Sequence, residues 1–229
     1  MIPNIIHQIW EGASEPLPEF LKELGSTWKN NHPSWSYEFW DKDKMNSFVE
    51  DNYPDFLETY LSYPYPVQRW DAIRYLILYK IGGLYVDFDY ESIEPIDKYI
   101  VGKKCVFSLD PVEHNMIFNK SLIITNALMG IEPRHPFMKV IIDNLSLVSS
   151  KAEDKINYVL ETTGPFFITK LYELYLKKEE IYLFPIELTT PLTQAEVNLY
   201  IKGRINEKIL DQKLRKAICV HYFFGSWYK

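Results

Sequence analysis

Residues 67–89, which read VQRWDAIRYLILYKIGGLYVDFD, decide the fold of this chain. Their first part carries apolar residues at helical spacing, which predicts a buried helical face formed by Val67, Trp70, Ile73, Ile77 and Ile81. Gly82 and Gly83 end this helix, because glycine adopts the left-handed cap conformation without a Cβ penalty. The run Leu84–Val86 then opens a buried strand. The segment therefore predicts a helix that returns directly into a strand.

The chain before this segment also alternates between strand and helix. Ile2–Trp10 is short, apolar and rich in β-branched residues, which predicts a buried strand. Phe20–Trp28 follows helical spacing, and Trp35, Tyr37 and Phe39 alternate as a second strand. A strand–helix–strand opening favours an α/β fold with a parallel sheet.

The rest of the chain continues this mixture of elements. We expect two short helices within Asp43–Tyr60, strands at Cys105–Leu109, Leu122–Leu128, Ile181–Phe184 and Ala217–Phe224, and helices at Pro136–Ser149, Ala152–Leu160 and Phe166–Leu176. No internal repeat, low-complexity segment or linker interrupts the sequence. Residues 1–229 are therefore expected to form a single domain.

The composition excludes several classes of protein. Of the 229 residues, 47% are hydrophobic and 24% are charged, which rules out a disordered or collagen-like chain. The 31 acidic residues outnumber the 25 basic ones, so we expect no nucleic-acid partner. Cys105 and Cys219 lie far apart, which excludes a zinc cluster and a disulfide framework and favours a reducing compartment.

No secretory signal is visible in the sequence. The start, Met1–Asn4, lacks the basic region and the apolar run of a secretory signal. No uncharged apolar stretch approaches the length of a transmembrane helix. The predicted location is the cytoplasm, and a peripheral contact with the inner face of the membrane stays open.

Asp87 and Asp89 are the strongest chemical signal in the sequence. Residues two apart in a strand point to the same face, with Cα atoms roughly 6.6 Å apart. Two carboxylates in that arrangement repel each other unless a cation lies between them, and Mn²⁺ or Mg²⁺ prefers oxygen ligands of this kind. Ligands of open α/β sheets also bind beyond the carboxyl ends of strands. The alternative is a solvated acidic turn.

Asp71 and Arg74 stand three residues apart on the polar side of the predicted helix, within reach of each other. They form either a surface ion pair of little energetic value or a positioned pair that faces the same pocket as the two aspartates. The pair of glycines that returns the chain into the strand favours the second interpretation.

The segment DAIRYLILYKIGGLYVDFD closely resembles the defining segment of the DXD sugar-binding glycosyltransferases of family 32. This family includes capsule and lipopolysaccharide glycosyltransferases and the yeast initiating mannosyltransferase, and the clostridial glucosylating toxins are distant relatives. Ile6–Trp10 is similar to the family's first strand, I-H-x-x-W, and His221–Trp227 is similar to its C-terminal motif. Asn126-Ala127 and Thr163–Pro165 match less specifically.

The resemblance implies which residues bind the donor. Trp10 would stack on the nucleotide base, and Asp71 and Arg74 would contact the donor sugar. Tyr85 would line the same pocket, and Asn126 would lie near the reacting carbon. For Trp10 the alternative is an ordinary place in the core.

The resemblance also implies a metal site and a C-terminal contribution. Asp87 would bind ribose and sugar hydroxyls and reach the cation, and Asp89 would be a direct metal ligand. His221 would be a further ligand of the metal or the phosphate, with a buried core histidine as the alternative. Ser226 and Trp227 would meet the pyrophosphate and the leaving oxygen. These two residues are adjacent here, whereas one residue separates them in the toxins.

The implied protein is a GT-A-like glycosyltransferase, with a Rossmann-like, mixed and mostly parallel sheet flanked by helices. It would move a hexose, with retention of configuration, from a nucleoside diphosphate sugar, first of all a UDP-sugar, to a glycan or glycolipid acceptor in capsule or lipopolysaccharide synthesis. Two alternatives stay open. One is a non-catalytic carbohydrate-binding or scaffold protein, and the other is an aspartyl phosphatase, which Glu91 disfavours because such enzymes usually carry Thr or Val there.

Overall fold

The computed structural model describes residues 1–11, 16–145 and 153–225. Within these ranges the main sheet has six strands in the order β2-β1-β3-β6-β5-β7. They are β1 (Ile5–Ile9), β2 (Ser36–Trp40), β3 (Gly83–Val86), β5 (Cys105–Leu109), β6 (Ile124–Ile131) and β7 (Tyr182–Leu183). Strand β6 is antiparallel to both of its neighbours, and the other pairings are parallel. The predicted α/β fold with a mixed, mostly parallel sheet is confirmed.

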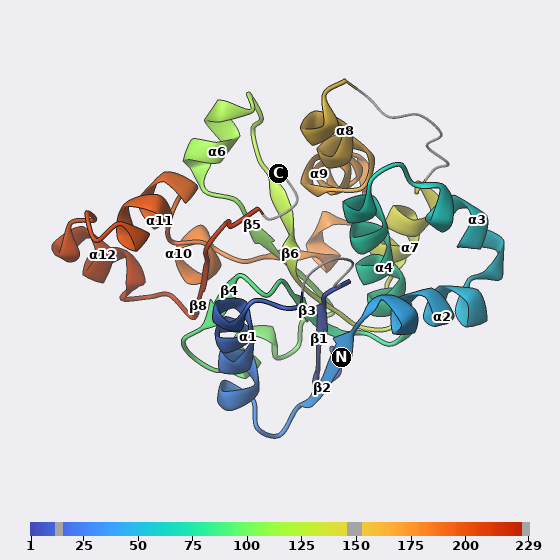
Figure 1. The fold of residues 1–229 in the computed structure, drawn as a ribbon, viewed down its shortest axis with the longest axis horizontal. Helices are drawn as coiled ribbons and strands as arrows, with labels where there is room; N and C mark the ends of the chain where they lie inside the picture. Colours follow the sequence, from blue (N-terminus) through green and yellow to red (C-terminus); the bar gives the residue numbers. More distant parts are fainter. Residues whose placement is uncertain (12–15, 146–152, 226–229) are drawn as a thin grey trace.

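Helices cover both faces of this sheet (Figure 1). The first half of the chain forms α1 (Glu19–Asn31), α2 (Lys42–Asn52), α3 (Pro54–Ser62), α4 (Pro66–Lys80), α5 (Asp97–Ile100) and α6 (Val112–Ile117). The second half forms α7 (Pro136–Asp143), α8 (Lys155–Thr162), α9 (Pro165–Leu174), α10 (Ile186–Thr189), α11 (Gln194–Ile201) and α12 (Glu207–Leu214). A short antiparallel pair, β4 (Tyr90–Ser92) with β8 (Cys219–His221), lies beside α1.

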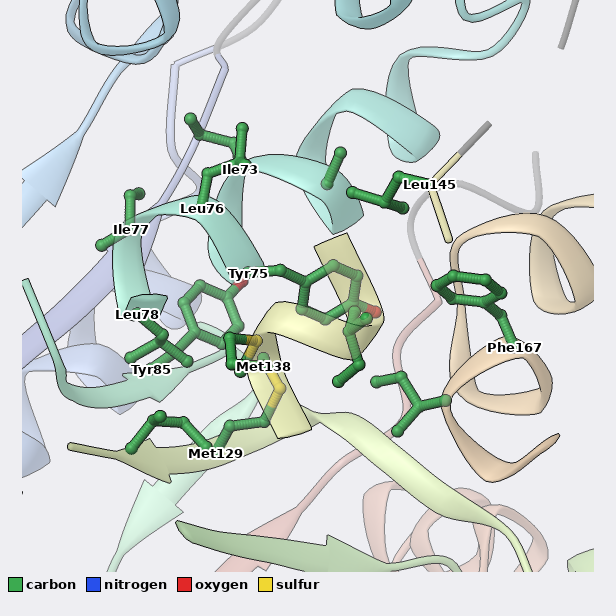
Figure 2. Packing of buried hydrophobic residues seen from close by; sticks show 14 of the residues in the cluster. Ile73, Tyr75, Leu76, Ile77, Leu78, Tyr85, Met129, Met138, Leu145 and Phe167 are labelled. Atoms are coloured by element: carbon green, nitrogen blue, oxygen red, sulfur yellow. The ribbon is translucent and has the colours of Figure 1, made fainter. Parts of the chain in front are cut away.

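The core is divided between the two faces of the sheet. The larger cluster joins α2, α3, α4, α7 and α9 to one face, and the smaller one joins α1 and the β4-β8 pair to the other. Figure 2 shows the side chains of α4 beside Tyr85 of β3, Met129 of β6 and Met138 of α7. Helix α4 is therefore covered by other elements on nearly all sides.

Helix α4 begins and ends where the sequence predicts a boundary. Pro66 occupies its first turn, where a missing N–H costs nothing. At its end Gly82 and Gly83 have φ values of 75° and 103°, in the region that favours glycine. A Cβ on Gly83 would lie 2.7 Å from the Ile5 carbonyl oxygen of β1. Glycine here therefore lets β3 pair closely with β1.

Several predicted boundaries shift, and some elements were missed. The first strand is Ile5–Ile9 rather than Ile2–Trp10, and the last is the three-residue Cys219–His221. The predicted helix at Pro136–Ser149 ends at Asp143, and its last predicted residues lie outside the described ranges. The sequence analysis did not anticipate β4, α5, α6, α10, α11 or α12. These elements are short or lack a strong apolar period, so pattern alone does not reveal them.

Candidate active site

One cavity of about 1110 Å³ lies beyond the carboxyl ends of β1 and β3. Its lining includes eight of the site residues predicted from the sequence: Trp10, Asp71, Arg74, Tyr85, Asp87, Asp89, Asn126 and His221. Ser226 and Trp227 lie outside the described residues, so their predicted roles stay predictions. The fold thus brings together side chains that are up to 211 positions apart in the sequence, from Trp10 to His221.

Asp71 is buried rather than on a solvent-facing side of α4, with an exposed fraction of 4%. Its Oδ1 accepts a hydrogen bond from Asn126 at 2.8 Å, and its Oδ2 accepts one from the Thr163 hydroxyl at 2.8 Å. Burial raises the pKa of Asp71 to about 6, although Arg74 and these two hydrogen bonds act in the opposite direction. The carboxylate is therefore rigidly held at the cavity wall.

Asn126 lies at an irregularity in the pairing of β6 with β5, and there its side chain contacts Asp71. Phe107 pairs with Met129 but the next residue, Ser108, pairs with Thr125, so residues 126–128 of β6 have no partner in β5. Such irregularities re-aim side chains and are common next to active sites. The Asn126 amide donates to Asp71 and, at 2.9 Å, to the Tyr75 hydroxyl.

Arg74 links the helix to the strand end. Its guanidinium lies 3.3 Å from Asp71 Oδ1 and 3.4 Å from Asp87 Oδ1. It also donates to the Asn126 carbonyl at 3.0 Å and lies over the Tyr85 ring, 4.6 Å from the centroid. Burial disfavours the charge, but the carboxylates, Asp87 above all, raise the pKa of Arg74 above its usual value. Arg74 therefore stays cationic and holds the two aspartates in place.

Asp87 remains open to the cavity, since its side chain is 31% exposed. The Tyr85 hydroxyl donates a short hydrogen bond to its Oδ1. Burial raises the pKa of Asp87, Arg74 opposes this effect, and the neighbouring Asp89 carboxylate adds to it. The two aspartates thus repel each other, as expected for a pair that would share a cation.

Asp89 is held by the C-terminal part of the chain. His221 Nε2 lies 3.2 Å from its Oδ1, and the Phe224 amide donates to its Oδ2 at 3.0 Å. Burial alone would raise the pKa of Asp89, but His221 and the backbone amides outweigh it and lower that pKa. Burial would in turn lower the pKa of His221, and the Asp89 carboxylate raises it. Asp89 is therefore anionic at neutral pH.

The residues present suit a hard divalent cation. Asp87 and Asp89 offer carboxylate oxygens to one cavity, and the buried His221 Nδ1 has no hydrogen-bond partner among the described residues. In the described part of the chain no three His, Cys, Asp or Glu side chains are grouped closely enough to hold an ion by themselves. A cation here would therefore need the phosphate oxygens of a donor as well, which is usual for Mg²⁺ and Mn²⁺. His221 as a direct ligand stays a prediction.

Trp10 lies at the end of β1, where its ring meets Phe88 edge-on with centroids 6.4 Å apart. The neighbouring Glu11 was missed by the sequence analysis. Its carboxylate, with a side chain 4% exposed, accepts from Arg69 at 3.1 Å and from the Trp70 indole in a short bond. This contact fastens the end of β1 to α4. Its position directly after Trp10 was the only signal in the sequence.

Comparisons with known proteins show to which family the chain belongs. The family model for the glycosyltransferase sugar-binding region containing the DXD motif matches residues 18–107. An uncharacterised glycosyltransferase of Acanthamoeba polyphaga mimivirus is 32% identical over 99% of this chain and 84% of its own length. The chain belongs to this glycosyltransferase family. The prediction of a family 32 glycosyltransferase is thereby confirmed at the level of the family.

Other relatives of this family carry more specific names. Inositol phosphoceramide mannosyltransferase 2 of Schizosaccharomyces pombe is 33% identical over 178 residues, which are 78% of this chain and 48% of the relative. The chain thus spans about half the length of such curated relatives. Among solved structures, the PaToxG glycosyltransferase superposes with a TM-score of 0.53 at 16% identity, over 93% of this chain and 79% of that one. This likeness confirms the GT-A fold.

The domain organisation and the question of a membrane-spanning helix concern the chain as a whole. A single domain over residues 1–229 stays a prediction. Within the described ranges, no helix has both the length and the apolar character needed to cross a membrane.

Proposed function

We propose that this protein transfers a hexose from a nucleoside diphosphate sugar to a hydroxyl group of a glycan or glycolipid acceptor, with retention of configuration. The observation that carries the proposal is that Asp71 and Arg74 of α4 line the same cavity as Asp87 and Asp89, and that Arg74 contacts both Asp71 and Asp87. Membership of the DXD glycosyltransferase family supports it.

The names of the relatives refine the choice of donor. The resemblance favoured a UDP-sugar, whereas the relatives in fission yeast are named as mannosyltransferases. GDP-mannose therefore belongs beside the UDP-hexoses in the first set of donors to be tested. A role in capsule or lipopolysaccharide synthesis and a cytoplasmic location stay predictions.

Different residues of the cavity would bind different parts of the donor. Trp10 offers a ring face to the base, and Asp71 offers an acceptor for sugar hydroxyls beside the cationic Arg74. Asp87 and Asp89, with the donor phosphates, would hold a divalent cation, which would neutralise the charge that develops on the departing diphosphate. Glu11 would keep Trp10 in place through its contact with α4.

Retention requires either a nucleophile on the reacting face or attack from the side of the leaving group. Asp71 is poorly suited as a nucleophile, because both of its oxygens accept hydrogen bonds and it is almost fully buried. We therefore favour attack of the acceptor hydroxyl from the side of the leaving group, with its proton passing to the departing diphosphate.

A glycolipid acceptor is supported by the apolar wall of the cavity and by the relatives named for inositol phosphoceramide. This wall is formed by Ile117, Phe118, Ile123, Leu160 and Phe166. Ile117 and its neighbour on α6, Met116, are 74% and 68% exposed. Such a surface suits a ligand with an apolar part, and it would also allow peripheral contact with a membrane.

The test measures release of nucleoside diphosphate from GDP-mannose and UDP-hexoses in the presence of Mn²⁺. Asp89→Asn is nearly isosteric and should fold, but it should lose roughly 100-fold or more in turnover, because a neutral amide binds a hard cation poorly. Asp211→Asn, an exposed site on α12, is the matched control and should keep the parent rate. Undiminished turnover of folded Asp89→Asn would contradict the metal assignment. Release of inorganic phosphate instead would indicate a phosphatase, and no release would indicate a binding module.

A further inference from the structure

The cavity has a second polar side besides the one formed by Asp71, Arg74, Asp87 and Asp89. Asp110 directly follows β5 and His114 lies on α6, and both line the cavity opposite α4. Strands β3 and β5 point the same way, because each is antiparallel to β6. The end of β5 therefore faces the same space as Asp87 at the end of β3.

The hydrogen bonds of His114 fix its protonation pattern. The backbone N–H of Gln194 donates to His114 Nε2 at 3.2 Å, so a neutral ring carries its proton on Nδ1. That nitrogen lies 3.5 Å from Asp110 Oδ2. His114 thus contacts the Gln194 amide with one ring nitrogen and faces Asp110 with the other, a position from which it can orient Asp110.

Asp110 keeps one oxygen for a ligand. Its side chain is 17% exposed, and Oδ1 accepts no hydrogen bond from the described residues. A carboxylate oxygen that is largely removed from water needs a donor partner. Without a cation between them, the charges of a diphosphate and of this carboxylate repel each other, whereas a hydroxyl group donates well to a carboxylate.

Phe223 joins this side of the cavity to the predicted metal site. Its ring centroid lies 4.9 Å from that of His114 and 4.0 Å from that of His221, the residue beside Asp89. Phe223 has φ of 50°, a strained value for a residue with a side chain, and Gln194 Nε2 donates to its carbonyl at 3.2 Å. Strain of this kind is found at ligand sites, where the surrounding structure holds it in place.

We propose that Asp110, oriented by His114, binds a hydroxyl group of the acceptor next to the hydroxyl that receives the sugar. The acceptor would then present neighbouring hydroxyls on a ring, as a sugar or a cyclitol does. This inference rests on the proposed function, because it assigns the acceptor side of the same cavity.

The experiment separates donor use from acceptor use. Release of nucleoside diphosphate is measured first with water as the only acceptor, and then with methyl α-mannoside or myo-inositol added. We expect Asp110→Asn to leave the reaction with water within twofold of the parent and to raise the KM for the added polyol about 10- to 100-fold, the usual effect of losing a charged hydrogen-bond partner. Asp211→Asn removes the same charge at an exposed site of α12 that does not line the cavity, and it should change neither quantity.

A second variant guards against a folding defect. His114→Phe keeps a ring against Phe223 but loses both nitrogens, and it should raise the KM for the polyol several-fold with an unchanged reaction with water. Equal losses in both reactions would assign Asp110 to the donor side and overturn the subsite. So would an unchanged KM in Asp110→Asn, or a parent protein that consumes donor but is not accelerated by either polyol. If the parent releases no diphosphate from any donor, the proposed function itself fails, and this outcome is visible before any polyol is added.

Discussion

At the scale of single residues, the carboxylate of Asp71 is 4% exposed and both of its oxygens accept hydrogen bonds, from Asn126 and from Thr163. A buried carboxylate resists ionisation because charge is poorly solvated there, and the pKa of Asp71 rises from 3.8 to about 6. The adjacent Arg74 only partly compensates. The ionised Asp71 carboxylate therefore lowers the free energy of unfolding, and it places a negative charge at the cavity wall.

The sign of its pH dependence follows from the two pKa values. Between about pH 4 and pH 6 the folded protein keeps a proton that the unfolded chain releases, so the parent loses stability as the pH rises. We expect Asp71→Asn, which cannot ionise, to gain up to about 3 kcal/mol relative to the parent between pH 4 and pH 7. Denaturant unfolding at each pH measures the difference, with Asp211→Asn as a control that should show no such gain. A difference that does not change with pH would contradict the burial of an ionised Asp71.

At the scale of elements, the junction between α4 and β3 depends on Gly83. The backbone of β1 passes so close that a Cβ would lie 2.7 Å from the Ile5 carbonyl oxygen and 3.0 Å from His7 Nε2. His7 is itself fixed, because Nε2 binds the Gly82 carbonyl and Nδ1 accepts from the Trp40 indole. Neither neighbour can move without disturbing the centre of the sheet.

Gly83→Ala should therefore destabilise the protein by about 3 kcal/mol or more, since backbone strain and a clash with backbone add together. Gly102→Ala is the matched control, because Gly102 has a similar positive φ of 72° but no atom within 4 Å of the added Cβ. It should cost only about 1–2 kcal/mol. Thermal unfolding of both variants gives the comparison, and equal losses would show that strain alone, and not the contact with β1, requires glycine at position 83.

At the scale of the whole molecule, the two ends of the chain meet at the cavity. Trp10 comes from the first strand, and His221 and Phe224 come from the last described segment, where they hold Asp89. The sheet places the ends of β1 and β3 side by side, and the β4-β8 pair brings the C-terminal segment to them. The cavity is thus assembled from segments near both ends of the described chain.

Trp10→Ala should weaken binding of the nucleoside diphosphate about 10- to 100-fold, by analogy with the 1–3 kcal/mol of base–aromatic stacking. Phe39→Ala is the control, because Phe39 also packs against Phe88, with centroids 6.1 Å apart, but does not line the cavity. Isothermal titration with GDP and UDP measures both variants. If the two variants lose affinity equally, Trp10 acts through the packing of Phe88 and not by contact with the base.

The sequence by itself determined the unit from α4 to Asp89 and, with it, the family. The apolar period of the helix, the glycine pair, the strand and the two aspartates are contiguous, so their relative places depend on short-range geometry that spacing reveals. The same contiguity explains why Asp71, Arg74, Tyr85 and Asp87 line one cavity.

Only the tertiary structure decided how distant segments complete that unit. The reversed direction of β6, the irregularity that turns Asn126 toward Asp71, and the contact of His221 with Asp89 join residues 42 to 132 positions apart. Neither the Glu11 contact with α4 nor the pairing of Asp110 with His114 follows from the sequence, for a related reason. A lone acidic residue or histidine carries no periodic signal, and its role depends on which side chains the packed fold places beside it.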